Sequence, residues 1–285
     1  MKRRRSPTDT TDAEWALVAP HLPAPADPGR GGRPRLHPLR EVVDAISSLV
    51  RSGCAWRLLP HEFPPWKTVF HSFRAWRRDG TWARLHAALR RRRREQLGRH
   101  PEPSAGIVDS QSIKTTGVGG PRGYDAGKQV KGRKRHLLVD TQGLVLAVKV
   151  RAAGIMDRDG IKLLLTPLKG ALARLKHVWP DAGYTGTGKG KDWAERELGW
   201  TAQIVRHPPK PRGVWVPAGV EPDWAAILPP PGFRVLPRRW VVERTFAWLG
   251  QSRRLSKDYE RLCEASEAVI HVAMSRLMLR HLARP

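Results

Sequence analysis

The chain has 285 residues, and its 52 lysines and arginines outnumber its 26 aspartates and glutamates, which gives a formal net charge of +26. An excess of this size predicts a polyanionic partner, of which nucleic acid fits best, and the sequence carries neither a membrane-length apolar run nor the apolar segment of a secretory signal. Cys54 and Cys263 form no C-x-x-C motif, which argues against the usual cysteine-rich zinc folds. Two cysteines far apart in the sequence favour a reducing compartment, the cytoplasm. With a nucleic-acid partner, the expected location is the nucleoid.

The first hundred residues are predicted to be entirely helical. Thr11–Glu14 has the spacing of a capping box, and the helix that it begins ends at Pro20. Apolar residues recur at helical intervals over 39–50 and stop at Gly53. Two further helices around residues 66–82 resemble a helix-turn-helix pair, so we expect this region to bind DNA.

Five consecutive arginines, Arg90–Arg94, follow that pair. On a helix they point in all directions, so they cannot all face one core. They either form a solvated helix end that complements the helix dipole, or also contact phosphates. The sequence leaves both interpretations open.

After Pro103 short strands and helices alternate. A strand ends near Asp109, a hairpin turns at Asp140–Gly143, and a helix with a break at Pro167 precedes another strand and turn at 177–184. A further strand and a Pro-rich insertion at about 207–235 separate this part from the last helices. This order predicts an α/β domain with a mixed sheet flanked by helices.

Three acids are candidates for one cluster. Asp109 and Asp181 each follow a predicted strand, and Glu243 lies on a late helix, in RRWVVERTFAWLG. Residues at strand ends of an α/β sheet project into one crevice, which would bring the acids together. Each also has a local alternative: Asp109 could cap a turn, Asp181 lies in the turn signature of residues 180–183, and Glu243 could pair with Arg239.

A cluster of three carboxylates needs a counter-ion, because like charges at short range raise each other's pKa. Oxygen ligands suit Mg²⁺, with Mn²⁺ as a substitute. Two such ions about 4 Å apart can clamp the attacking and leaving oxygens of a phosphodiester. A basic protein with an acidic centre is therefore predicted to cut or rejoin nucleic acid.

A collinear set of strings then carries a family resemblance. It includes RSGCAWRLLPHEFPPWKTVFHSFRAWRRDGTW, VDSQSIKTT, GYDAGKQVKGRKRHLLVDTQGLVLAVKV, DRDG, VWPDAGYTG and LPRRWVVERTFAWLGQSRRLSKDYE. With these strings the chain resembles, over almost its whole length, the transposases of the IS-five group of bacterial insertion sequences, within the DDE class. The resemblance implies a helical DNA-binding region at 1–100, a ribonuclease-H-like catalytic domain at 101–285, and a metal-binding DDE triad of Asp109, Asp181 and Glu243.

The family signature around the glutamate is Tyr-x2-Arg-x3-Glu-x6-Lys. Arg239 and Glu243 match it, whereas Leu236 stands at the tyrosine position and Gly250 at the lysine position. The departures concern contacts with DNA and leave the metal ligands intact. Arg253, Arg254 and Lys257 are candidates to supply the missing charge.

Other basic residues are candidates for holding the DNA backbone near the metals. They are Lys128, Lys131, Arg133, Lys134 and Arg135, which run toward the hairpin's second strand, together with Arg239. A solvated basic loop is the alternative for the first five.

The predicted function is DNA transposition by metal-assisted phosphoryl transfer. Water attacks a phosphodiester at the element end, and the freed 3′-hydroxyl attacks target DNA. The resemblance implies terminal inverted repeats and target DNA as substrates, and a dimer or higher multimer on DNA. The alternative class is a catalytically silent, transposon-derived DNA-binding protein, which the presence of all three acids disfavours.

Overall fold

The computed structural model describes residues 4–24, 35–185, 190–205, 217, 219–224 and 238–284. Most of the Pro-rich insertion that the sequence predicts at about 207–235 lies outside these residues. Within the described residues, no helix is both long and apolar enough to cross a membrane.

The N-terminal region is helical, as predicted. Its elements are α1 (Asp12–Val18), η1 (Ala19–His21), α2 (Leu39–Ser52), η3 (Trp56–Leu58), α3 (Trp66–Arg78) and α4 (Thr81–Gln96). The capping box of α1 is confirmed, because the Glu14 N–H donates to Thr11 Oγ1 at 3.1 Å and the Thr11 N–H donates to Glu14 Oε2 at 2.8 Å. Gly53 ends α2 with a φ of +77°, which favours glycine.

In the described part of the chain, six strands form one mixed sheet. They are β1 (Ala105–Lys114), β2 (Gly123–Asp125), β3 (Val130–Asp140), β4 (Val145–Ala152), β5 (His177–Pro180) and β6 (Thr201–Ala202). The order is β2-β3-β1-β5-β6, and β4 pairs with β3. β1 is antiparallel to β3 and parallel to β5. Asp140 forms the predicted hairpin turn, because its Oδ1 accepts hydrogen bonds from the N–H groups of Gln142 and Leu144 at 2.9 Å each.

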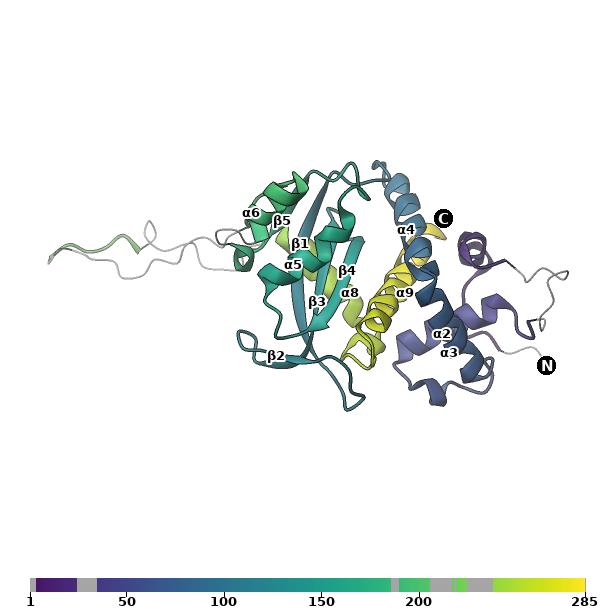
Figure 1. The fold of residues 1–285 in the computed structure, drawn as a ribbon. Coiled ribbons are helices and arrows are strands. Elements are labelled where there is room, and N and C mark those ends of the chain that lie inside the picture. Colours follow the sequence, from purple (N-terminus) through teal and green to yellow (C-terminus); the bar gives the residue numbers. More distant parts are fainter. Residues whose placement is uncertain are drawn as a thin grey trace.

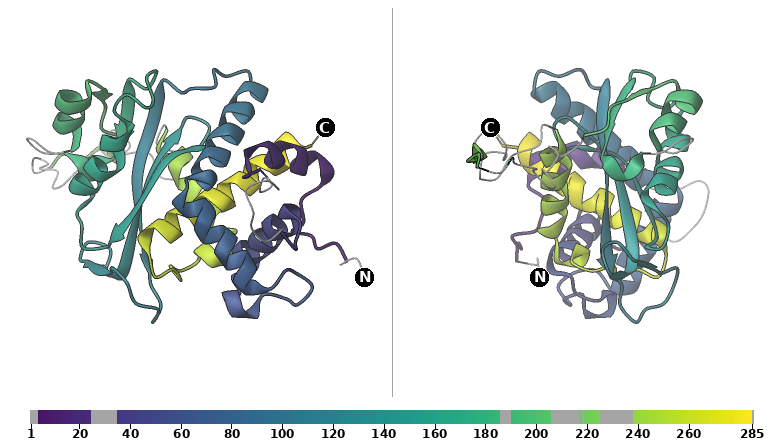
Figure 2. Two further views of the ribbon diagram at one scale, coloured as in Figure 1. Left: turned by 45° about the vertical axis from the view of Figure 1, so that its right-hand side comes forward. Right: turned by 90° about the vertical axis from the view of Figure 1, so that its left-hand side faces the viewer.

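Helices cover both faces of this sheet (Figures 1 and 2). One face carries α5 (Asp157–Leu165), η4 (Thr166–Leu168), η5 (Ala182–Tyr184), α6 (Gly190–Trp193) and η6 (Ala194–Leu198). The other carries α8 (Arg239–Gly250), η7 (Arg253–Leu255) and α9 (Cys263–Leu282). Side chains alternate along a strand, so Ile107 and Leu137 join the core with α8 and α9, whereas Val108 joins the smaller core with α5.

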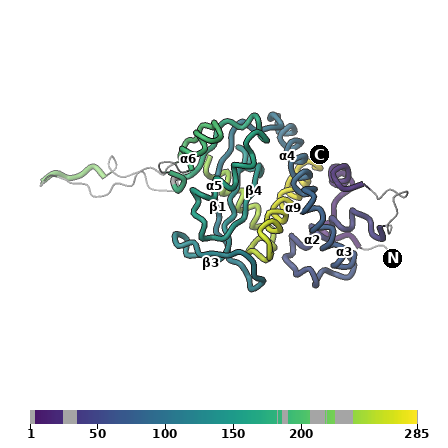
Figure 3. Tube along the Cα trace, viewed as in Figure 1, coloured from purple at the N-terminus to yellow at the C-terminus, as the bar shows by residue number. Residues whose placement is uncertain are grey.

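The N-terminal helices share a core with the end of the chain. Trp82 of α4 and Ile46 of α2 belong to the same buried cluster as Val269 and Met274 of α9. Figure 3 shows both termini on this helical side, away from the strands. The predicted boundary near residue 100 is thus a change from helix to sheet within one continuous apolar core.

Candidate functional site

Two of the three candidate acids lie side by side at one edge of paired strands. Strands β1 and β5 run parallel with Val108 opposite Pro180, so Asp109 and Asp181 are the next residues on each. Asp181 directly follows β5, as predicted. Asp109 was expected to follow its strand, and this is wrong: it lies inside β1, because pairing with β3 continues through Lys114.

Asp109 is the more enclosed of the two carboxylates. Its Oδ1 accepts a hydrogen bond from the N–H of Ser110 at 2.7 Å. The pKa of Asp109 is raised to about 6, chiefly by burial and also by the charge of Asp181, against the hydrogen bond from Ser110 and the charges of Arg239 and Lys128, which lower it. This enclosed carboxylate therefore favours a positive neighbour, which would stabilise its charged form.

Asp181 makes the turn contact that its local sequence predicts. The Gly183 N–H donates to Asp181 Oδ1 at 2.8 Å, and the Tyr184 N–H donates to the Asp181 carbonyl oxygen at 3.2 Å. Its second carboxylate oxygen, Oδ2, lies 3.6 Å from Nη1 of Arg239. One oxygen thus holds the turn while the other faces the site.

Glu243 lies on α8, one helical turn after Arg239. Val241, Val242 and Leu249 anchor that helix in the core, which turns Glu243 outward, with 55% of its side chain exposed. The predicted salt bridge also exists, since Arg239 Nε donates to Glu243 Oε1 at 3.2 Å. Arg239 thus contacts both Asp181 and Glu243.

The donor set suits a hard divalent cation, because it consists of carboxylate oxygens. Asp109 and Asp181 are neighbours, and a cationic group, the Arg239 guanidinium, already lies against Asp181 and Glu243. Among the described residues no three acidic, histidine or cysteine side chains converge closely enough to hold a metal. The chemistry of the three acids fits a divalent cation, and Arg239 contacts two of them, Asp181 and Glu243.

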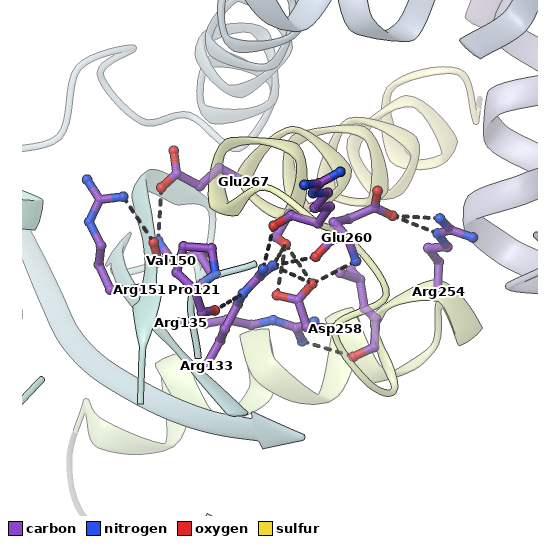
Figure 4. Close-up of polar contacts among 12 residues, drawn as sticks. Pro121, Arg133, Arg135, Val150, Arg151, Arg254, Asp258, Glu260 and Glu267 are labelled. Carbon is purple, nitrogen blue, oxygen red and sulfur yellow. Dashed lines mark hydrogen bonds and ion pairs between the residues drawn. The ribbon is translucent and has the colours of Figure 1, made fainter. Parts of the chain in front are cut away.

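Four of the residues predicted to bind DNA are buried instead. Arg133, Lys134, Arg135 and Arg254 are each no more than 6% exposed. Figure 4 shows where three of them are engaged. Arg133 donates to Asp258 and to the carbonyl oxygens of Pro121, Glu260 and Arg261.

The other three also have internal partners. Arg135 donates to the Leu255 carbonyl, Arg254 to Glu260 and to the Cys54 carbonyl, and Lys134 pairs with Asp125 and Asp157. The sequence pattern could not show that both faces of β3 are covered. We therefore withdraw Arg133, Lys134, Arg135 and Arg254 from the set expected to contact DNA.

Lys128, Lys131, Arg239 and Arg253 keep solvent access, so their predicted contact with DNA stays a prediction. Lys128 lies beside the acidic edge, because its Nζ donates to the Ser110 carbonyl oxygen at 3.0 Å. Beneath it the Ser110 hydroxyl donates to Asp157 Oδ1 at 2.7 Å. Asp157 lies in the first turn of α5, and the DRDG string is the only signal in the sequence for its contact with Ser110.

The predicted helix-turn-helix pair presents a basic face that sequence reasoning did not single out. The buried residues of α3 are Val69, Phe73 and Trp76. Its opposite face carries exposed residues at helical spacing, namely Lys67, His71, Arg74 and Arg78. Helix α3 contains no acidic residue, so this stripe is uniformly basic or neutral.

Of the run Arg90–Arg94, two members belong to the interior. Arg90 pairs with Glu102 at 3.7 Å, and Arg94 pairs with Asp140 and donates to the His100 carbonyl. Arg91 and Arg92 are exposed. The run therefore divides between a buried anchor and a solvated surface.

Comparisons with known proteins agree along the chain. A family model described as putative transposase of the IS4/5 family matches residues 10–86, and the transposase DDE domain model matches residues 100–278. A putative transposase for insertion sequence element IS402 from Burkholderia cepacia is 30% identical over 153 residues, which is 51% of this chain and 60% of the relative. The chain thus spans less than two thirds of that relative. No solved structure matches the chain.

Proposed function

Because the chain belongs to the family of transposases with a DDE domain, which is ribonuclease-H-like and generally uses divalent metal ions, we propose that it cleaves DNA at the ends of an insertion sequence and transfers them into target DNA. The mixed sheet with helices on both faces agrees with such a domain. The observation that carries the proposal is the placement of Asp109 beside Asp181, with Glu243 tied to Asp181 through Arg239.

We assign the metal ligands to Asp109, Asp181 and Glu243, and the cofactor to two Mg²⁺ ions for which Mn²⁺ can substitute. When bound, such ions supply activation of water and stabilisation of charge on the phosphodiester. The protein itself positions the three carboxylates. Asp109 and Asp181 are fixed by paired strands, whereas Glu243 approaches from an exposed helix face and can adjust its rotamer.

The basic residues near this edge would hold the DNA backbone. Lys128 sits over Ser110, next to Asp109, and Arg239 lies among the acids. A planar guanidinium with several donors suits a phosphate. Lys131 and Arg253 are exposed, and we propose that they also contact the DNA backbone.

Substitution of the acids tests the catalytic assignment. Asp109→Asn, Asp181→Asn and Glu243→Gln should each abolish strand cleavage of element-end DNA while leaving metal-free DNA binding intact. Glu264→Gln is a matched control for Glu243, because its side chain is 56% exposed and also pairs with an arginine, Arg151. Full cleavage by any of the three variants removes that residue from the triad.

Residues 1–100 are proposed to recognise the element ends, with the basic stripe of α3 contacting DNA. In the full chain, Arg74→Gln with Arg78→Gln should weaken binding and flatten its salt dependence, by a log–log slope of about 0.9 per lost phosphate contact. Arg196→Gln, exposed on the far side of the sheet, should leave the slope unchanged. An unchanged slope for the α3 variant would place the DNA elsewhere.

The proposed partners are double-stranded DNA at the terminal inverted repeats and at the target, at the nucleoid, with the protein as a dimer or higher multimer on DNA. Residues 101–285 are proposed as the catalytic domain. A supercoiled-plasmid nicking assay with and without Mg²⁺ separates this function from that of a silent DNA-binding protein, which would bind and never nick.

A further inference from the structure

Arg239 occupies a central place among the three acids. Its Nε donates to Glu243 at 3.2 Å, its Nη1 lies 3.6 Å from Asp181 Oδ2, and its charge also acts on Asp109. A single guanidinium therefore neutralises part of the charge on all three proposed ligands. It directly contacts two of them, Asp181 and Glu243.

We propose that Arg239 is an internal placeholder for the divalent cation, which must displace the guanidinium from Asp181 and Glu243 to bind. This inference rests on the proposed function, since it takes the three acids as the metal ligands. It goes further by giving the metal-free protein a built-in competitor for its own cofactor. Its physical basis is that one positive group replaces another between the same oxygens.

The contacts of Arg239 are suited to exchange. About a quarter of its side chain is exposed, as is about a quarter of that of Asp181, and Glu243 is more than half exposed. Ion pairs with this much solvent access contribute little to stability, so breaking them costs little. Asp181 also keeps its turn hydrogen bond from Gly183 through Oδ1, so losing Arg239 leaves its carboxylate held in place.

Displacement would also give the arginine a second use. A released guanidinium on the first turn of α8 remains beside the acids and can receive a phosphate. Binding of the cation and of the DNA backbone would then favour each other, because each removes the competitor of the other. By linkage, such coupling must be reciprocal.

Metal binding without DNA tests this inference directly. Binding of Mn²⁺ alone to the full-length protein, measured by the loss of the free-ion EPR signal, should be about two- to five-fold tighter for Arg239→Gln than for the parent, the gain expected on removing an exposed ion pair. Unchanged or weaker binding by Arg239→Gln overturns the proposal, since the arginine would then be a bystander or a support for the ligands. Absence of Mn²⁺ binding by both proteins overturns it as well.

Arg244→Gln is the matched control. This arginine lies on the same helix, stacks between Trp240 and Trp248, and donates to the Gln142 carbonyl rather than to the acids. Arg244→Gln removes the same charge as Arg239→Gln. Equally tighter Mn²⁺ binding by both variants would therefore indicate a long-range charge effect and refute the role of Arg239 as a placeholder.

A third variant separates failure of this inference from failure of the proposed site. Asp181→Asn should weaken Mn²⁺ binding if Asp181 is a ligand. If it does so and Arg239→Gln changes nothing, only the placeholder is wrong. If Asp181→Asn leaves Mn²⁺ binding intact, the proposed metal site itself fails, and the placeholder with it.

Discussion

The buried cluster around Arg133 and the site around Arg239 each pair an arginine with carboxylate, and they use it differently. At the buried cluster of Figure 4, Arg133 and Asp258 meet at 3.1 Å with side chains 0% and 1% exposed. At the acidic edge, Arg239 faces Asp181 and Glu243 at 3.6 and 3.2 Å with solvent access on every side chain. The chemistry of the pair is the same, and its surroundings decide its role.

At the buried cluster the hydrogen bonds share partners and form a network around Asp258. Asp258 accepts from Arg133 and Ser266, and its own N–H donates to the Lys114 carbonyl of β1 at 2.9 Å. Asp258 thus fastens the segment between α8 and α9 to both β1 and β3. Because the segment that Asp258 holds directly follows α8, and α8 carries Glu243, this buried cluster supports the position of the solvent-accessible site around Arg239.

The largest expected effect is at the buried cluster. Asp258→Ala leaves Arg133 buried without its carboxylate, which should lower the free energy of unfolding by about 3–5 kcal/mol. Urea denaturation followed by circular dichroism measures it. Glu264→Ala, at an exposed pair, is the control and should cost under about 0.5 kcal/mol. A loss below about 1 kcal/mol for Asp258→Ala would show that burial does not distinguish the two regions.

Lowering the pH tests a second buried site, the histidine pair between α4 and α9. His86 of α4 stacks on His271 of α9 at 5.0 Å between ring centres, and the pKa of His271 is lowered to about 4, chiefly by burial and also by the charge of Arg90. Because this folded-state pKa lies below the unfolded value near 6.5, the unfolded chain binds more protons between them, so stability falls as pH falls through that window.

From pH 7.5 to 5, His271 should account for about 2 kcal/mol of that loss. His271→Phe keeps the ring and removes the titration, so its free energy of unfolding should fall by about that much less over the same pH change. Chemical denaturation of both proteins at the two pH values measures the difference. Equal losses would show that the helix interface tolerates the charge.

At the solvent-accessible site around Arg239, Asp181→Asn should change the free energy of unfolding of the metal-free protein little. Repulsion among the acids alone would make this variant up to about 1 kcal/mol more stable, but Arg239 offsets that repulsion, so we expect a change within about 0.5 kcal/mol. Mg²⁺ should then raise the parent's melting midpoint more than the variant's. Equal shifts in thermal melts would mean that Asp181 is no ligand in the free protein.

The smallest stability effect is expected for Glu243→Gln. Its pair with Arg239 is exposed, so the free energy of unfolding should change by less than about 0.5 kcal/mol. Cleavage of element-end DNA should nevertheless be lost. A large loss of stability in this variant would make Glu243 a structural residue and remove the contrast with Asp258.

The sequence by itself determined the local structure. The capping box at Thr11, the end of α2 at Gly53 and the hairpin turn at Asp140 depend on residues a few positions apart, and all three are present. The order of strands and helices predicted a mixed sheet between helices, which is present. The parallel pairing of β1 with β5 places Asp109 beside Asp181, although Asp109 lies inside its strand and not at its end.

Only the tertiary structure decided which charges are available. Arg133 looked like a DNA contact because its neighbours are basic, but its partner Asp258 lies 125 residues further on. The N-terminal helices show only their own periodicity in the sequence, whereas in the structure they share a core with α9. Burial and ion pairing depend on which distant segments cover a residue, and a strand or helix pattern reports only its own periodicity, so neither could be derived before the chain was folded.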